Sequence, residues 1–134
     1  MNPQGLIEQQ VVPRPVVLDS AQKFCQVFME IPQYKAYEQA NADLRDDAEA
    51  HAAAQAYSQK LGSLRIPIKL KTVSEKDKLE LQNLKDAYDQ TPSVIAFNKA
   101  DQELRAVAQQ LGDILSQSID MDFGNRCRQP DPCC

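Results

Sequence analysis

The sequence predicts an all-α fold of antiparallel helical hairpins or a bundle, in two similar halves that each pair a short helix with a long one. Only 4 glycines occur in 134 residues, which disfavours a β-sandwich or barrel with its many turns. Pro32 and Pro92 each stand where a first helical residue is expected. From Phe97 to Ile114 the apolar residues recur at alternating spacings of three and four, a repeat typical of packed helices.

The N-terminal segment, residues 1–17, is expected to be an irregular arm. It has no sustained apolar repeat, and it contains three prolines: Pro3, Pro13 and Pro15. The first helix is expected to begin after Asp19 or Ser20 as the N-cap and to end near Glu30.

The second helix is expected to begin at Pro32 and to continue without a break to about Lys60, with Gly62 just beyond its end. Alanines recur at multiples of four along it, and such a stripe lets a neighbouring helix approach closely. The following segment, Leu64–Lys71, alternates apolar and basic residues around Pro67. We expect an extended connector whose apolar residues pack on the bundle. A lone edge strand is the alternative.

The third and fourth helices have clear start signals. Ser74 and Asp77 resemble a capping box with Asp in place of Glu, and the helix that follows is expected to end near Gln90. Thr91 and Pro92 form an N-cap and first-residue pair that begins the last helix. Its apolar stripe is expected to consist of Phe97, Ala100, Leu104, Val107, Leu111, Ile114 and Ser118.

A shift of 60 residues superimposes the two halves. Pairs of identical residues related by this shift are Pro32 and Pro92, Ala36 and Ala96, Ala40 and Ala100, Leu44 and Leu104, and Arg45 and Arg105. The identities favour two related helical units. Convergence of two similarly capped helices on one pattern is the alternative interpretation.

Two runs of residues carry a resemblance to a known family. The first run consists of Tyr34, Tyr37, Ala40, Leu44, Asp47 and Ala48. The second consists of Leu81, Leu84, Tyr88, Pro92, Val94, Phe97, Ala100 and Leu104. In order and spacing they resemble the YlbF/YmcA family over about Asp19 to Ile119. Residues 18–119 are therefore expected to form a YlbF-like helical domain, followed by a cysteine-containing tail at 120–134.

The resemblance implies a small all-helical bacterial protein that binds other proteins and has no known catalysis. Some family members form a complex with a PSP1-domain protein that influences RNA processing by ribonuclease Y, competence, sporulation and biofilm formation. Members of that complex are associated with iron–sulfur clusters held by cysteines, some near the C-terminus. Cys127, Cys133 and Cys134 are the positions here that match this feature. The chain departs from the family in its proline-rich arm and in the connector around Pro67.

The tail also points to metal chemistry by itself. Cys127, Cys133 and Cys134 fall within the last eight residues, and thiolates ligate zinc and iron–sulfur clusters. Three thiolates are one short of the usual four, so Cys25, another subunit or a partner would supply the last ligand. The alternative is a tail with free thiols.

Signals for catalysis are weak, so we expect the protein not to be an enzyme. Asp47 and the only histidine, His51, are one turn apart and would form a base and its orienting group, or a plain helix contact. The sequence contains no phosphate-binding glycine loop and no nucleophile elbow. Arg45 and Arg105 are expected to form local ion pairs, and a docking patch is the alternative.

Charge and length restrict the partners. The net charge of −4 disfavours direct nucleic-acid binding, and no apolar stretch approaches the roughly 20 residues that span a membrane. Without a signal-like N-terminus, a cytoplasmic location is expected. A chain this short leaves apolar stripes of its long helices uncovered, so a homo-oligomer is expected. The predicted function is a non-catalytic regulatory adaptor; a metal- or redox-responsive protein is the alternative.

Overall fold

The structure is a computed structural model, and it describes residues 11–123. Within this range it contains six α-helices and no strand. The helices are α1 (Arg14–Phe28), α2 (Pro32–Asp46), α3 (Ala48–Ser63), α4 (Arg65–Lys69), α5 (Glu75–Asp89) and α6 (Pro92–Ile119). The all-α prediction is confirmed.

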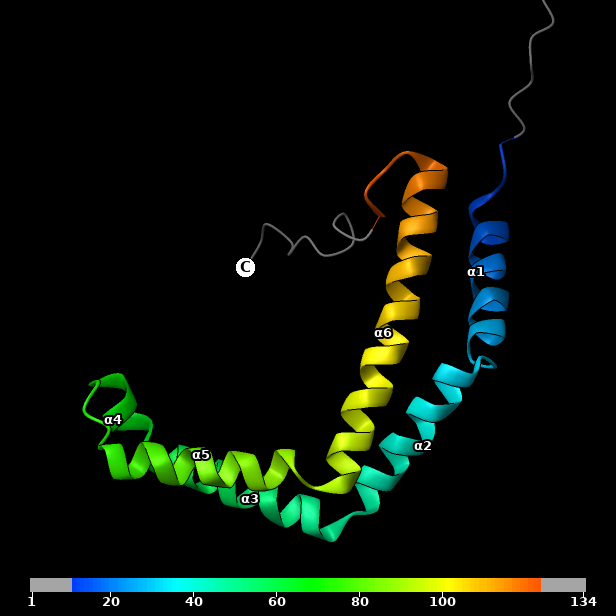
Figure 1. The fold of residues 1–134 in the computed structure, drawn as a ribbon. Helices are drawn as coiled ribbons and strands as arrows, with labels where there is room; N and C mark the ends of the chain where they lie inside the picture. The colour runs from blue at the N-terminus through cyan, green and yellow to red at the C-terminus, as the bar shows by residue number, and fades with distance from the viewer. Residues whose placement is uncertain (1–10, 124–134) are drawn as a thin grey trace, which may run out of the picture.

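The helices form two arms that meet at a bend (Figure 1). In one arm α2 packs antiparallel to α6, and in the other α3 packs antiparallel to α5. The helix α4 lies at the free end of the α3–α5 arm, and α1 lies at the free end of the α2–α6 arm (Figure 1). The predicted antiparallel hairpins are therefore present, but they are spread along two directions.

The expected continuous helix from Pro32 to Lys60 is wrong, because the chain breaks at Asp47. This residue has extended backbone angles (φ −84°, ψ 101°) and its carboxylate accepts from the N–H groups of Glu49 and Ala50. It is therefore both the end of α2 and the N-cap of α3. The position related by the 60-residue shift is Val107, which cannot cap a helix, and α6 continues through it unbroken.

The first helix begins at Arg14, earlier than the expected start at Asp19 or Ser20. Pro13 is its N-cap and Pro15 lies in its first turn, where a proline lacks only an N–H that would have no helical partner. The hydroxyl of Ser20 does not cap the helix; it donates to the carbonyl of Val16 one turn earlier.

The expected extended connector is a short helix, α4. Pro67 is the third residue of α4, where its missing N–H costs no helical hydrogen bond. Gly62, expected just beyond the preceding helix, lies inside α3. Of the connector's apolar residues, only Leu64 is buried, and Ile66 and Leu70 are largely exposed.

The start signals of the last two helices are confirmed in position. The hydroxyl of Ser74 accepts from the N–H of Asp77 at 3.1 Å and donates to its carboxylate at 2.8 Å. Thr91 is the N-cap residue of α6 by backbone, but its hydroxyl donates instead to the carbonyl of Ala87 in α5. The Thr91 side chain therefore joins the end of α5 to the start of α6.

The core is thin and consists mainly of small side chains. The buried residues of the described range are Ala40, Ala50, Leu64, Thr91, Val94 and Ala100. Tyr37 and Phe97, related by the 60-residue shift, contact each other across α2 and α6 with ring centroids 5.5 Å apart. Alanine at the shift-related positions 40 and 100 lets the two helix backbones approach closely.

Candidate protein-interaction surface

The first helix has an apolar side that no other described element covers. No residue of α1 is buried. Its exposed large apolar residues are Val16, Val17, Leu18, Phe24 and Val27. The Phe28 ring lies 6.2 Å from that of Phe24 and 6.0 Å from that of Tyr34 at the start of α2. These ring contacts connect α1 to the arm and leave the rest of its apolar side open.

The C-terminal part of α6 is uncovered as well. At 1.5 Å per residue, a 15-residue α2 covers about 22 Å, roughly half the length of the 28-residue α6. The apolar residues left exposed near the end of this arm are Ile114, Leu115, Ile119, Met121 and Phe123. Ile114 of the expected apolar stripe is therefore exposed in the single chain, because α2 is too short to reach it.

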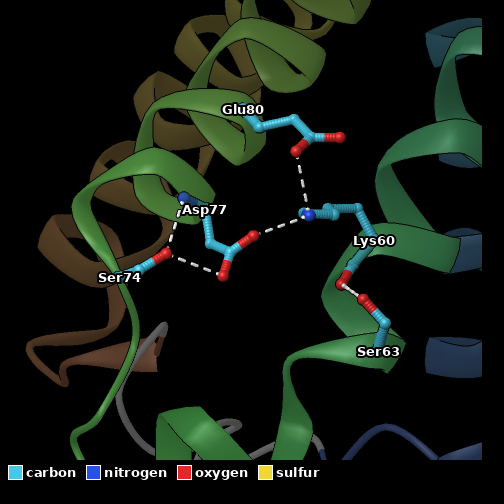
Figure 2. A network of polar contacts seen from close by, with 5 residues as sticks. All are labelled: Lys60, Ser63, Ser74, Asp77 and Glu80. Carbon is cyan, nitrogen blue, oxygen red and sulfur yellow. Dashed lines mark hydrogen bonds and ion pairs between the residues drawn. The ribbon is translucent and has the colours of Figure 1, made fainter.

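An ion-pair cluster fixes the two helices of the other arm near its free end. Lys60 of α3 contacts Asp77 of α5 at 2.8 Å and Glu80 at 3.0 Å, and Figure 2 shows its amino group between the two carboxylates. The hydrogen bonds that Lys60 donates to Asp77 and then to Glu80 raise the pKa of Lys60. The bonds that the Asp77 carboxylate accepts from Lys60 and then from Ser74 lower the pKa of Asp77. The cluster sets the position from which α4 projects.

A second polar contact joins the arms at the bend. The Ser93 hydroxyl at the start of α6 donates to the Asp47 carboxylate at 2.5 Å. This bond, and then the backbone bond from Ala50, lowers the pKa of Asp47. The capping role of Asp47 was not predicted; its chemistry was considered only as a pair with His51. The available signal was an Asp directly before an alanine-rich run with Glu49 in the first turn.

The Asp47 and His51 side chains do not form the catalytic pair considered from the sequence. Ring nitrogen Nε2 of His51 lies 2.7 Å from the carbonyl oxygen of Arg45, and the Asp47 oxygens bond to Ser93 and to backbone N–H groups. His51 and Arg45 line a shallow hollow of about 280 Å³ beside Tyr88. The structure therefore assigns both side chains to local contacts at the bend.

The two arginines related by the repeat differ in their contacts. Arg105 pairs with Asp101 one turn earlier at 2.7 Å, so the predicted local ion pair is confirmed there. Arg45 makes no ion pair with any residue in 11–123.

The predicted metal ligands Cys127, Cys133 and Cys134 lie outside the described residues. Cys25, the candidate fourth ligand, is exposed on α1 with a free thiol. Among residues 11–123 no three His, Cys, Asp or Glu side chains are grouped closely enough to hold a metal ion.

The comparison with protein families decides the relationship. A family model described as control of competence regulator ComK, YlbF/YmcA, matches residues 17–120. The chain belongs to the YlbF/YmcA family. This range covers all six helices except the first turn of α1, so the YlbF/YmcA match includes both arms and the bend. The resemblance seen in the sequence is thereby confirmed, and a regulatory role follows from the family.

Further comparisons add no relative. Neither a protein of curated function nor a solved structure matches this YlbF/YmcA chain. None of the described helices is long and apolar enough to cross a membrane.

Proposed function

We propose that this protein is a non-catalytic regulatory adaptor that acts through helix-mediated protein–protein contacts. The observation that carries the proposal is the uncovered apolar side of α1, a 15-residue helix with no buried residue. An isolated helix of this length is only marginally stable in water, because packing of an apolar side supplies most helix stability in proteins. A partner that covers Phe24 and Val27 would supply that packing.

The partner follows from the family resemblance. The adaptor joins a cytoplasmic complex with a PSP1-domain protein that modulates RNA processing by ribonuclease Y and developmental regulation. The control of the competence regulator ComK named for the family is one output of such a complex. Membership in a regulatory family and the local roles of Asp47 and His51 both support a protein without catalysis.

The experiment is an affinity capture from lysate with the full chain as bait. Wild type is expected to recover a PSP1-domain protein, and a Phe24→Ser/Val27→Ser variant is expected to lose it. The matched control is Lys23→Ser/Gln26→Ser, which changes neighbouring polar residues of the same helix. Equal recovery by all three baits would exclude α1 as the contact surface, and recovery of no PSP1-domain protein by wild type would contradict the named partner.

Self-association is part of the proposal. The apolar residues exposed at the end of α6 lie beyond the reach of α2, and exposed apolar surface marks interaction sites. Light scattering is expected to show a mass above 15.0 kDa at micromolar concentration. A monomer throughout that range would contradict self-association.

A second candidate function is a metal- or redox-responsive site formed by the tail cysteines. Cys127, Cys133 and Cys134 supply three soft thiolate ligands, and the exposed Cys25 thiol has the chemistry of a fourth. An iron–sulfur cluster or zinc ion bound there would be shared with a partner chain, and its loss would weaken the complex.

The tail is tested by purification under anaerobic conditions, alone and with its partner, with iron, sulfide and zinc analysis. Wild type is expected to carry metal that a Cys127→Ser/Cys133→Ser/Cys134→Ser variant lacks. The same negligible metal content in both proteins, with equal assembly, would remove this candidate.

A further inference from the structure

The free end of the α3–α5 arm is basic in an acidic protein. Residues 50–74 contain no Asp or Glu, although the chain has 19 acidic residues. Of the four cations in this segment, Lys60 is held by Asp77 and Glu80. The other three are exposed and make no ion pair within the described range: Arg65, Lys69 and Lys71.

Apolar side chains project to solvent between these cations. Ile66 is 71% exposed and Leu70 is 67% exposed, and Leu64 is the only buried residue of the segment 64–71. Ile68 adds a third exposed side chain at 44%. We name the surface formed by residues 65–71 the basic tip. Branched apolar residues at this exposure, ringed by cations without counterions, are typical of a contact with an acidic and apolar surface.

The end of the α2–α6 arm has the opposite character. Residues 106–123 contain Asp113, Asp120 and Asp122 and no Lys or Arg; the next cations in sequence, Arg126 and Arg128, lie outside the described residues. The same stretch exposes five large apolar residues, namely Ile114, Leu115, Ile119, Met121 and Phe123. We name the surface formed by residues 113–123 the acidic end.

We propose that the basic tip of one copy of this chain docks against the acidic end of a second copy. The two surfaces carry opposite charge, and both present aliphatic side chains. They lie at the free ends of different arms (Figure 1), so one chain does not satisfy both by folding on itself. A second copy can cover both surfaces, because every copy carries one basic tip and one acidic end.

The two touching surfaces differ. Two bent chains that face each other about a twofold axis form the contact twice and close as an isologous pair, whereas other relative rotations make the contact heterologous and extend it into a chain of copies. Opposite charges at the rim of such a contact speed association and set its register, and salt screens them. This inference rests on the proposed self-association and assigns the surfaces that form it.

Charge reversal tests the contact. A basic-tip variant, Arg65→Glu/Lys69→Glu, and an acidic-end variant, Asp113→Lys/Asp120→Lys, are each expected to weaken self-association at least tenfold in sedimentation at low salt. An equimolar mixture of the two variants is expected to restore it, because each reversed surface then meets its complement. Circular dichroism of each variant checks that the helices are intact.

The control variant, Lys35→Glu/Lys99→Glu, changes the net charge by the same amount on exposed residues away from the basic tip, and it is expected to self-associate as wild type does. Self-association that persists in both reversed variants, or a mixture no stronger than its parts, would overturn the contact while leaving the adaptor proposal intact. A wild type that stays monomeric would contradict both the contact and the proposed self-association. A basic-tip variant that loses only the PSP1-domain partner would assign the tip to that partner and overturn the contact between copies.

Discussion

Ser93 and Asp47 are 46 residues apart in sequence, and the Ser93 hydroxyl donates a 2.5 Å hydrogen bond to the Asp47 carboxylate across the bend. The same carboxylate accepts from the N–H groups of Glu49 and Ala50 at 2.9 and 3.2 Å. One side chain therefore begins α3 and ties it to the start of α6. Asp47 therefore has hydrogen-bond partners on both sides of the bend.

Replacement of Asp47 by Ala is expected to destabilise the protein more than replacement of Ser93 by Ala. The first change removes all three hydrogen bonds of the carboxylate, including the N-cap of α3, and the second removes one. Asp47→Asn keeps one acceptor oxygen and is expected to fall between them. Urea unfolding followed by circular dichroism ranks the three, and an equal loss for Asp47→Ala and Ser93→Ala would contradict the capping role.

The Asp47 contacts also predict a dependence on pH. Its pKa lies below the ordinary value of 3.8 in the folded chain, so the folded state favours the ionised form. The resulting stabilisation is fully present above about pH 4 and is lost as the pH falls through the folded pKa. Ser93→Ala is expected to raise the Asp47 pKa toward 3.8, measured by NMR titration of the carboxyl carbon. Ser118→Ala, which alters a bond within α6, serves as control and is expected to leave that pKa unchanged.

Two adjacent residues of α6 are expected to respond very differently to truncation. Val94 is 2% exposed and Ile95 is 53% exposed. Val94→Ala is expected to cost about 2 kcal/mol of unfolding free energy, because it removes buried methyl groups at the bend and leaves a cavity. Ile95→Ala is expected to stay within about 0.5 kcal/mol of wild type in the monomer. Similar losses of unfolding free energy for the two variants in denaturant would contradict a core position for Val94.

The Lys60 cluster is expected to contribute modestly to the stability of the fold, and high salt is expected to weaken this contribution. Lys60→Met is expected to lower the melting temperature, since it separates α3 from Asp77 and Glu80 of α5. The matched control Lys78→Met breaks an exposed pair with Glu75 inside α5 and is expected to have little effect. High salt is expected to shrink the difference between Lys60→Met and wild type. If Lys78→Met lowered the melting temperature as much as Lys60→Met, the cluster would have no special role in stability.

The rate of amide hydrogen exchange is expected to differ between helices that pack on a neighbour and helices that do not. Amides of α1 are expected to exchange faster than those of α6 between Ala96 and Leu104, because α1 has no buried residue and α6 packs on α2 there. Protection of α1 equal to that of α6 in dilute samples would contradict its open apolar side.

Local signals in the sequence were sufficient to predict where three of the six described helices begin. Pro32, Ser74 and Pro92 mark starts that the structure confirms, because capping depends on a few neighbouring residues. The resemblance to the YlbF/YmcA family was carried by apolar spacing and is confirmed by the family match. The contact of Tyr37 with Phe97, which the shift of 60 residues relates, was not predicted, because antiparallel helices bring equivalent positions together only near the point where they cross.

The break at Asp47 could have been predicted only in part. Asp at this position is a good N-cap, but the same residue in the middle of an uninterrupted helix is also common on a solvent-facing side. What favours the break is the hydroxyl of Ser93, which reaches the carboxylate only after α6 has packed beside α2. Connector residues Ile66 and Leu70 were expected to be covered for a similar reason, since alternation of apolar residues does not say whether a partner surface lies opposite.

The sequence by itself therefore determined the class of fold, the start signals of α2, α5 and α6 and the family, because these depend on residue type and spacing along the chain. The tertiary structure decided the two arms, the short α4 and the exposure of Ile114. Coverage depends on how far a neighbouring helix extends: α2 begins only at Pro32 and packs antiparallel on α6, so the last half of α6 is left open. A pattern of apolar residues specifies which side of a helix packs against a neighbour, and only the folded chain shows where no neighbour is present.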